Sequence, residues 1–154
     1  MKRTAVLIGV SLMVFFASSV FAAEADGILG KWWNEKKDAH IQIYKCDAGY
    51  CGKIAYLKEP VYNEKDTRGM AGKPKVDREN PDPAKRTNPI IGLNIISGFT
   101  YAGENVWEGG TIYDPEEGKT YKCKLTLEKP DKLKVRGYIG TPLLGKTQYW
   151  MRVK

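Results

Sequence analysis

Histidine, cysteine and long apolar runs are scarce in this sequence. Its single histidine, His40, excludes a histidine-rich metal site, and three cysteines are too few for a four-cysteine zinc site or a dense disulfide scaffold. The one long apolar run, from Ala5 to Ala17, is shorter than the roughly 20 residues that a membrane-spanning helix needs. The length of 154 residues is enough for one domain and excludes a two-domain enzyme.

The apolar run has the flanks of a secretory signal peptide. Lys2 and Arg3 precede it, and Val20-Phe21-Ala22 ends it with small residues at the two positions that define a cleavage site. We expect residues 1–22 to be removed, by a cut that could also fall three residues later, and residues 23–154 to form one domain in the periplasm or outside a bacterial cell. An uncleaved membrane anchor is the alternative. Cleavage lowers the net charge from +7 to +5, because two cations leave, and no stable membrane insertion is then expected.

Short runs of alternating apolar and polar residues fill the rest of the chain, separated by Gly, Pro, Asn and Asp. The clearest run places Cys123, Leu125 and Leu127 on one face and lysines on the other, as in antiparallel strands with one dry face. Hairpin-length connections predict an all-β fold: an eight-stranded antiparallel up-and-down barrel, whose closure removes exposed edges. The expected strands are 30–35, 39–46, 51–58, 92–101, 106–113, 119–128, 132–139 and 146–153.

One connection is too long for a hairpin. Residues 59–89 contain 13 charged residues and five prolines, so this segment is too polar to be core. The stiff Asn80-Pro81-Asp82-Pro83 indicates an ordered loop rather than a free tail. Loops of this length are either solvated surface segments or lids and binding loops, and both interpretations stay open.

Cys46 and Cys51 stand at the end of one expected strand and the start of the next. A hairpin brings such ends close enough for a disulfide, and an exported protein meets an oxidising compartment. We therefore predict a structural Cys46–Cys51 bridge. A redox-active pair is the weaker alternative, because such pairs usually have two intervening residues and sit at a helix start. Cys123 is expected to be a buried apolar residue.

Two motifs are rejected on physical grounds. Residues 140–147 match the phosphate-binding pattern G-x-x-x-x-G-K-[ST], but that loop works only when a helix follows, and the residues after Lys146 have a strand pattern. Asp77, Glu79 and Asp82 lack the spacing of an EF-hand calcium loop. We expect no metal site and no cofactor. We also expect no nucleic-acid partner, because the lysines are scattered over strand faces rather than clustered with aromatic residues.

Trp32 follows Gly30 at the start of the first expected strand, and Arg152 lies in the last. In a closed barrel these strands are neighbours, so the guanidinium can stack on the indole and seal one end. The pair resembles the lipocalin pattern, in which a Gly-x-Trp opens the first strand and an arginine of the last strand packs over the Trp.

The mature chain also resembles, nearly from end to end, a bacterial family of exported proteins, domain of unknown function 2147. The resemblance implies a lipocalin-like fold and supplies neither a catalytic residue nor an established substrate. Its matching residues are Gly30-x-Trp32, Cys46-x4-Cys51-Gly52, Asn80-Pro81-Asp82-Pro83 with Arg86, Gly92-Leu93, Trp107-x-Gly109-Gly110, Ile112-Tyr113-Asp114-Pro115, Gly118-Lys119-x-Tyr121, Val135-Arg136-Gly137-Tyr138 and Trp150-x-Arg152.

These observations favour a lipocalin-like binding protein for a small, largely apolar or amphipathic ligand. No catalytic activity is expected, because nothing in the sequence pairs a nucleophile with a base. The alternative is an envelope interaction or stress-response protein that acts through its basic surface and the 59–89 loop, with a barrel filled by its own side chains. Arg136 would suit a carboxylate or phosphate head group if it faced the barrel mouth. The candidate wall and mouth residues are Tyr56, Asn94, Trp107, Tyr113, Tyr121, Arg136 and Tyr149.

Overall fold

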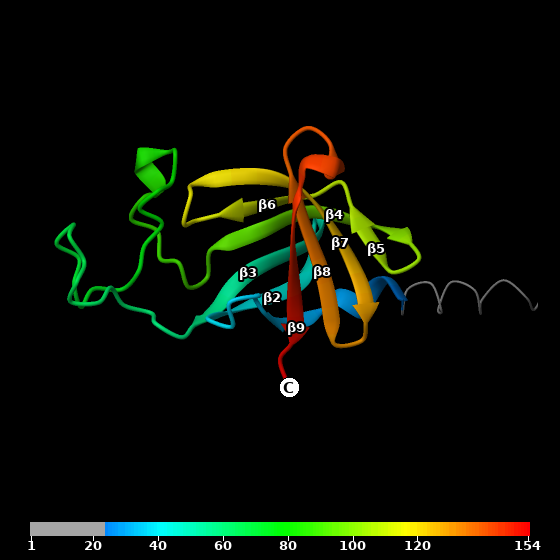
Figure 1. Cartoon of the computed structure of the whole chain (residues 1–154), viewed down its shortest axis with the longest axis horizontal. Helices are drawn as coiled ribbons and strands as arrows, with labels where there is room; N and C mark the ends of the chain where they lie inside the picture. Colours follow the sequence, from blue (N-terminus) through cyan, green and yellow to red (C-terminus); the bar gives the residue numbers. More distant parts are fainter. Residues whose placement is uncertain (1–23) are drawn as a thin grey trace, which may run out of the picture.

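The structure, a computed structural model, describes residues 24–154 as one antiparallel β-barrel (Figure 1). The expected signal peptide lies outside the described residues. The strands are β1 (Gly30–Trp33), β2 (Ala39–Cys46), β3 (Gly49–Leu57), β4 (Asn94–Gly103), β5 (Val106–Glu108), β6 (Thr111–Asp114), β7 (Lys119–Lys129), β8 (Lys132–Tyr138) and β9 (Lys146–Arg152). Three short 3₁₀ helices complete the described part: η1 (Asp26–Ile28), η2 (Pro83–Lys85) and η3 (Pro142–Leu144).

The predicted eight-stranded closed barrel is confirmed, with one strand broken in two. The expected strand 106–113 divides into β5 and β6 at Gly109 and Gly110, and both pieces lie between β4 and β7. Gly110 lies against the Phe99 ring, where any side chain would collide with it. The break therefore lets a buried aromatic ring sit directly beneath the barrel wall.

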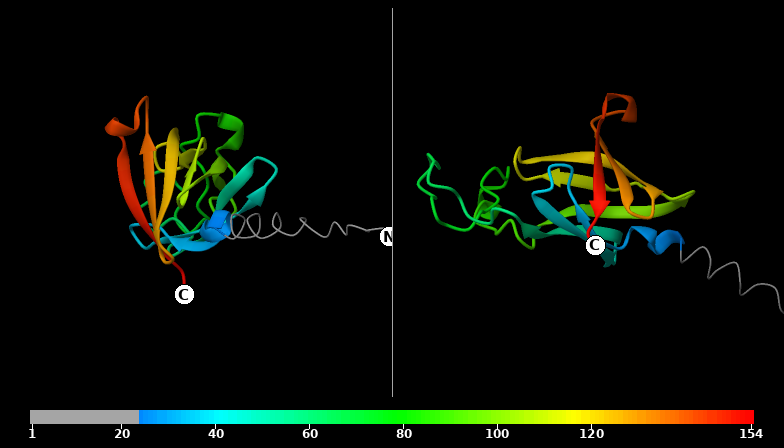
Figure 2. Two further views of the ribbon diagram at one scale, coloured as in Figure 1. Left: turned by 90° about the vertical axis from the view of Figure 1, so that its right-hand side faces the viewer. Right: turned by 60° about the horizontal axis from the view of Figure 1, so that its bottom comes forward.

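Closure joins the ends of the sheet. Neighbouring strands pair in chain order, β3 pairs with β4 through Tyr50 and Phe99, and β1 pairs with β9 through Trp32 and Arg152. Figure 2 shows β8 and β9 (orange and red) returning beside the first strands (blue and cyan). Along each strand alternate side chains point into the barrel, and most of the buried ones are apolar.

One end of the barrel is filled by η1 and two tryptophans. Ile28 and Trp32 are fully buried, and the Trp32 indole N–H donates to the Ile28 carbonyl at 2.9 Å. Trp107, also fully buried, donates its indole N–H to the Ala25 carbonyl at 3.0 Å. Each large ring thus has its polar atom satisfied by the segment that covers the opening.

Arg152 holds this end together. Its guanidinium lies 4.2 Å from the centre of the Trp32 ring, which is the stacking expected from the sequence. The same group donates hydrogen bonds to three backbone carbonyls on both sides of the seam between the first and last strands. The acceptors are Gly27 at 2.6 Å, Leu29 at 2.8 Å and Pro130 at 2.7 Å.

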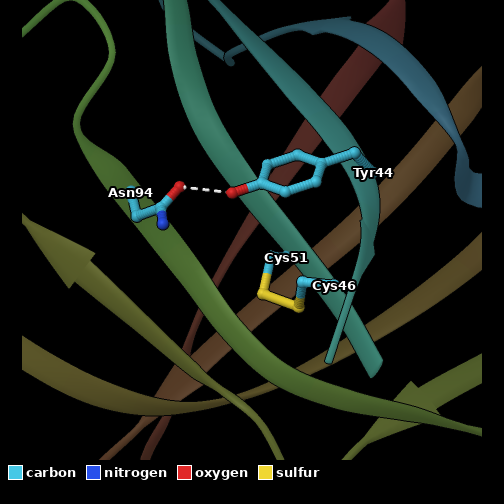
Figure 3. Close-up of a disulfide and its surroundings, with 4 residues drawn as sticks. All are labelled: Tyr44, Cys46, Cys51 and Asn94. Atoms are coloured by element: carbon cyan, nitrogen blue, oxygen red, sulfur yellow. Dashed lines mark hydrogen bonds between the residues drawn. A yellow bond between two sulfur atoms is a disulfide. The ribbon is translucent and has the colours of Figure 1, made fainter. Parts of the chain in front are cut away.

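The predicted disulfide is confirmed at the β2–β3 hairpin, where the Cα atoms of Cys46 and Cys51 are 5.9 Å apart (Figure 3). Beside it the Tyr44 hydroxyl donates to the Asn94 side-chain oxygen at 2.7 Å, so β2 is linked to β4 across β3. Cys123 is buried in the core, as predicted, and burial raises the pKa of its thiol to about 12.

Removing the Arg152 guanidinium should open the sealed end. We expect Arg152→Met to lower the free energy of unfolding by about 2–4 kcal/mol, because three carbonyls lose a charged donor and Trp32 loses its cover. Urea unfolding followed by tryptophan fluorescence measures this. Arg68→Met, at a largely exposed arginine of the long loop, is the control and should change stability by less than about 0.5 kcal/mol. Equal effects of the two substitutions would contradict the sealing role.

Cysteine chemistry gives an independent check of the core. We expect the native protein not to react with Ellman's reagent, because the Cys123 thiol is buried and the other two cysteines are joined. Denaturation without a reductant should release one reactive thiol per chain, and denaturation with a reductant three. Fast labelling of the folded protein would show that Cys123 is accessible.

Candidate functional site

A cavity of about 1400 Å³ opens at the end of the barrel away from η1. Ligand pockets commonly measure about 300–1,000 Å³, so the space is ample for a small molecule. Four connections surround the opening: the β1–β2 loop, the long 59–89 loop, the β6–β7 turn and the β8–β9 loop. The barrel is therefore filled at one end and hollow at the other.

The inner part of the cavity is apolar. Its wall consists of inward-facing residues that alternate with outward-facing polar neighbours along their strands. Such a surface favours an apolar ligand, because burial of apolar area is the main source of its binding free energy. Buried wall residues come from five different strands: Ile41, Ile54, Ile95, Val135 and Trp150.

The rim is charged and has more acids than bases. An ion pair with an N–O distance of 2.8 Å joins Lys36 of the β1–β2 loop to Glu116 of the β6–β7 turn. The rim carries eight acids and six bases although the whole chain is basic, so it does not favour an anionic head group. The acids are Glu35, Asp38, Glu59, Asp66, Glu79, Asp114, Glu116 and Glu117, and the bases are Lys36, Lys58, Lys65, Lys75, Arg78 and Lys146.

The long loop is tied to the barrel wall by a buried carboxylate. Asp77 is fully buried, and it accepts hydrogen bonds from the Tyr113 hydroxyl at 2.7 Å and from the Asn80 amide at 2.6 Å. Burial, together with the neighbouring carboxylate, raises the pKa of Tyr113 well above its usual value. Asp77, one of the residues considered for calcium binding, thus anchors the loop. No group of three or more His, Cys, Asp or Glu residues within 24–154 is placed to hold a metal ion.

The part of this loop that faces the cavity is stabilised by contacts among its own side chains. The Tyr62 hydroxyl donates to the Val76 carbonyl at 3.0 Å, and the Arg78 guanidinium lies 4.3 Å from the Tyr62 ring centre. Arg78 also donates to Asp66 at 2.6 Å, which lowers the pKa of that carboxyl. Gly118 of the β6–β7 turn, at φ +67°, lies against the backbone of the loop where no side chain would fit. The cavity wall on this side is therefore ordered.

Two of the seven predicted ligand-contact residues, Tyr113 and Tyr121, line the cavity. The Tyr121 hydroxyl donates to the Glu117 carboxylate at 2.5 Å. This hydrogen bond lowers the pKa of Glu117 and, with a smaller contribution from burial, raises the pKa of Tyr121 to about 12. Both tyrosines therefore present uncharged rings to the cavity with their hydroxyls already bonded.

The other five lie elsewhere. Trp107 faces inward but at the sealed end, against Ala25. Tyr56 should share a face with Ile54, but a bulge in the β2–β3 pairing at His40 and Ile41 turns its ring to the outside. The remaining three are on the outer face. Asn94 accepts a hydrogen bond from Tyr44, Arg136 donates to the β8–β9 loop, and the Tyr149 ring makes a cation–π contact with the Lys132 ammonium.

The Arg136 placement corrects the expectation of a head-group site. Its guanidinium donates to the carbonyls of Pro142 at 2.7 Å and Leu143 at 3.3 Å, and to the Thr147 hydroxyl at 2.7 Å. Its strand neighbours Val135 and Gly137 face the cavity, so Arg136 points away from it. The group organises the β8–β9 loop from outside the barrel.

The sequence did not single out the apolar wall residues, although alternation in the expected strands places them on inner faces. Tyr62 is different, because it reaches the cavity from the long loop and had no periodic signal. Because its sequence neighbours are charged and bounded by prolines, they predict a solvent-exposed position for Tyr62 rather than one in a cavity wall. Only the fold of the loop brings this buried ring to the mouth.

The single histidine is also outside the cavity. His40 packs on the outer face between Trp33 and Tyr56, with ring centres 3.9 and 4.6 Å away. Its Nε2 is buried without a hydrogen-bond partner. Burial, and to a smaller extent the nearby Lys31 charge, lowers the pKa of His40 below its ordinary value of 6.5.

Comparison with known proteins places the chain in a family and a fold. The family described as "Uncharacterized protein conserved in bacteria (DUF2147)" matches residues 30–152. A solved structure, reported as "Protein HP1028 from the human pathogen Helicobacter pylori belongs to the lipocalin family", is similar with a TM-score of 0.67 and 21% identity, over 82% of this chain and 83% of that one. No curated protein matches. Within residues 24–154, no helix has the length and apolarity to cross a membrane.

The outer-face histidine should make stability depend on pH. A base with a lowered pKa in the folded state stabilises fully above its unfolded value of about 6.5, and this contribution is lost as the pH falls below it. We expect the free energy of unfolding to decrease between about pH 7.5 and 5.5, before most carboxyls titrate. His40→Gln should flatten the dependence in that window, since His40 is the one histidine of the chain. An unchanged slope in urea titrations would contradict this assignment.

Proposed function

Because the chain belongs to the DUF2147 family and folds as a lipocalin-like barrel, we propose that it is an exported binding protein for a small, largely apolar ligand. The observation that carries this proposal is the cavity of about 1400 Å³, open at one end and apolar in its depth. The sealed opposite end limits the ligand to one entrance.

The wall chemistry supports an uncharged or amphipathic ligand. Deep in the cavity, contacts come from branched aliphatic side chains and Trp150. Nearer the mouth, Tyr113 and Tyr121 offer aromatic faces whose hydroxyls are already donated to carboxylates. An apolar body in the depth, with a small polar end among the rim side chains, matches this gradient.

Binding rather than catalysis fits the location of the reactive groups. His40 packs among aromatic rings on the outer face, and Cys123 is buried with a raised pKa. Neither residue borders the cavity. Export to the periplasm or the medium is supported by the Cys46–Cys51 disulfide and by the signal-like sequence of residues 1–22.

The alternative, an envelope interaction or stress-response protein with a filled barrel, has less support. A hollow of this size is unlike a barrel packed by its own side chains. The long loop is also anchored by the buried Asp77 and its partners, so it forms part of the cavity wall. We retain the binding function as the conclusion.

Filling the cavity should abolish binding. Val135 is a buried wall residue, and Val135→Trp places an indole in the hollow. We expect this variant to bind the apolar fluorescent probe N-phenyl-1-naphthylamine at least about tenfold more weakly than the wild type, because the indole displaces the probe from the apolar surface. Native mass spectrometry of the wild type, purified without detergent, should in parallel detect a co-purified small molecule.

The matched control is Lys134→Trp. Lys134 precedes Val135 on β8 and faces outward, so the same ring is added outside the barrel and probe binding should be unchanged. Thermal unfolding of both variants shows whether they remain folded. Failure of the wild type to bind the probe, or equal binding by the two variants, would refute a ligand site in the cavity.

A further inference from the structure

We propose that the β8–β9 loop docks the barrel onto an anionic lipid bilayer. The docking element is the tip loop, defined as residues 139–145, which includes η3. Figures 1 and 2 show it (orange-red) projecting beyond the neighbouring connections. It lies in the segment that matches the phosphate-loop pattern, but here a strand follows, as expected from the sequence.

The tip loop has the most exposed large apolar side chains of the described chain. Leu143 is 89% exposed, Leu144 83% and Ile139 68%, whereas the next such residue, Ile91, is 47% exposed. Transfer of an apolar side chain from water into a hydrocarbon environment is favourable in free energy. Three of them grouped on one projecting loop form a surface that fits the apolar boundary of a bilayer.

The backbone of the tip loop is held in this exposed form. Arg136 donates to the carbonyls of Pro142 and Leu143, and so fixes the short 3₁₀ turn from outside the barrel. Gly145 lies against the Gly137 carbonyl, where a side chain would not fit. The leucines are thus presented by a folded loop, and docking does not have to order it.

Positive charge surrounds the base of the tip loop. In the strand register, Lys122 is opposite Tyr138 and Lys146 is opposite Gly137, one on each side of β8, with Arg136 between them. Lys122 and Arg136 lie on the outer face, whereas Lys146 borders the cavity rim, where Glu117 interacts with it. Three cations around one apolar tip complement a surface of anionic head groups, which attracts each nearby lysine or arginine.

The size of the tip loop favours a bilayer over a protein partner. Stable protein interfaces bury about 1,200–2,000 Å², more than a convex loop of seven residues supplies. A bilayer needs no complementary shape and accepts a few inserted side chains. Ile139 and Leu144 also border the cavity, so docking would place the mouth beside the lipid surface while the acid-rich rim stays out of contact with it. Delivery of a ligand from the bilayer would depend on the proposed function, but the docking itself does not.

Vesicle sedimentation tests the proposal. A chain that begins at Ala23 contains the whole described barrel and lacks the apolar run before it. We expect it to bind vesicles of phosphatidylcholine mixed with phosphatidylglycerol, and to bind pure phosphatidylcholine vesicles less. Leu143→Ser combined with Leu144→Ser should weaken binding about tenfold or more. Lys122→Gln combined with Lys146→Gln should weaken it about fivefold per lysine at low salt and little at high salt.

The control is Val61→Ser combined with Ile91→Ser, which removes two partly exposed apolar side chains away from the tip loop. It should bind vesicles as the wild type does. Absence of wild-type binding, or equal binding by the tip variant, would overturn the proposal. Concentration-dependent dimerisation that the tip substitutions abolish, without vesicle binding, would instead assign the loop to a second copy of the chain. Vesicle binding combined with failure of the probe experiment would refute the ligand site and leave the docking intact.

Discussion

The structure depends on the seam where the last strand meets the first. A sheet of this kind closes only if β9 returns to β1, and the pairing between them is short. Arg152 strengthens it by covering Trp32 and by donating to three carbonyls of segments that would otherwise be free to separate. One charged group therefore seals the barrel wall and one opening together, and the hollow at the other end follows from that asymmetry.

The side chains inside the barrel have different roles at its two ends. Trp32, Trp107 and Phe99 are fully buried in the half of the barrel near η1, and their rings fill the interior there. The hollow half is lined mainly by aliphatic residues, and its tyrosines are held by carboxylates of the long loop and the β6–β7 turn. The same barrel thus has a packed half that stabilises the fold and an open half whose apolar surface remains available.

Alternation in the sequence predicted the strands and the inward faces, since a period of two is a local property. It could not predict depth along the barrel axis, which is why Trp107, a candidate wall or mouth residue, lies at the sealed end instead. Nor could it predict the bulge that turns Tyr56 outward, because a bulge depends on pairing with another strand. Arg136 was misplaced for a third reason: its partners belong to a loop whose fold no periodic pattern encodes.

The two largest mouth loops differ in length and composition, and they are supported in different ways. The 59–89 loop contains a buried aspartate that is bonded to Tyr113 and a buried tyrosine that lines the cavity, so part of its backbone is held at the barrel mouth and completes the cavity wall. The β8–β9 loop has no such anchor in its own side chains. Its support comes from Arg136 on the outer face, which binds backbone carbonyls and leaves Leu143 and Leu144 exposed. Because the supporting arginine is itself cationic, the arrangement that exposes the leucines also places positive charge at their base, which is the combination that an anionic lipid surface would recognise.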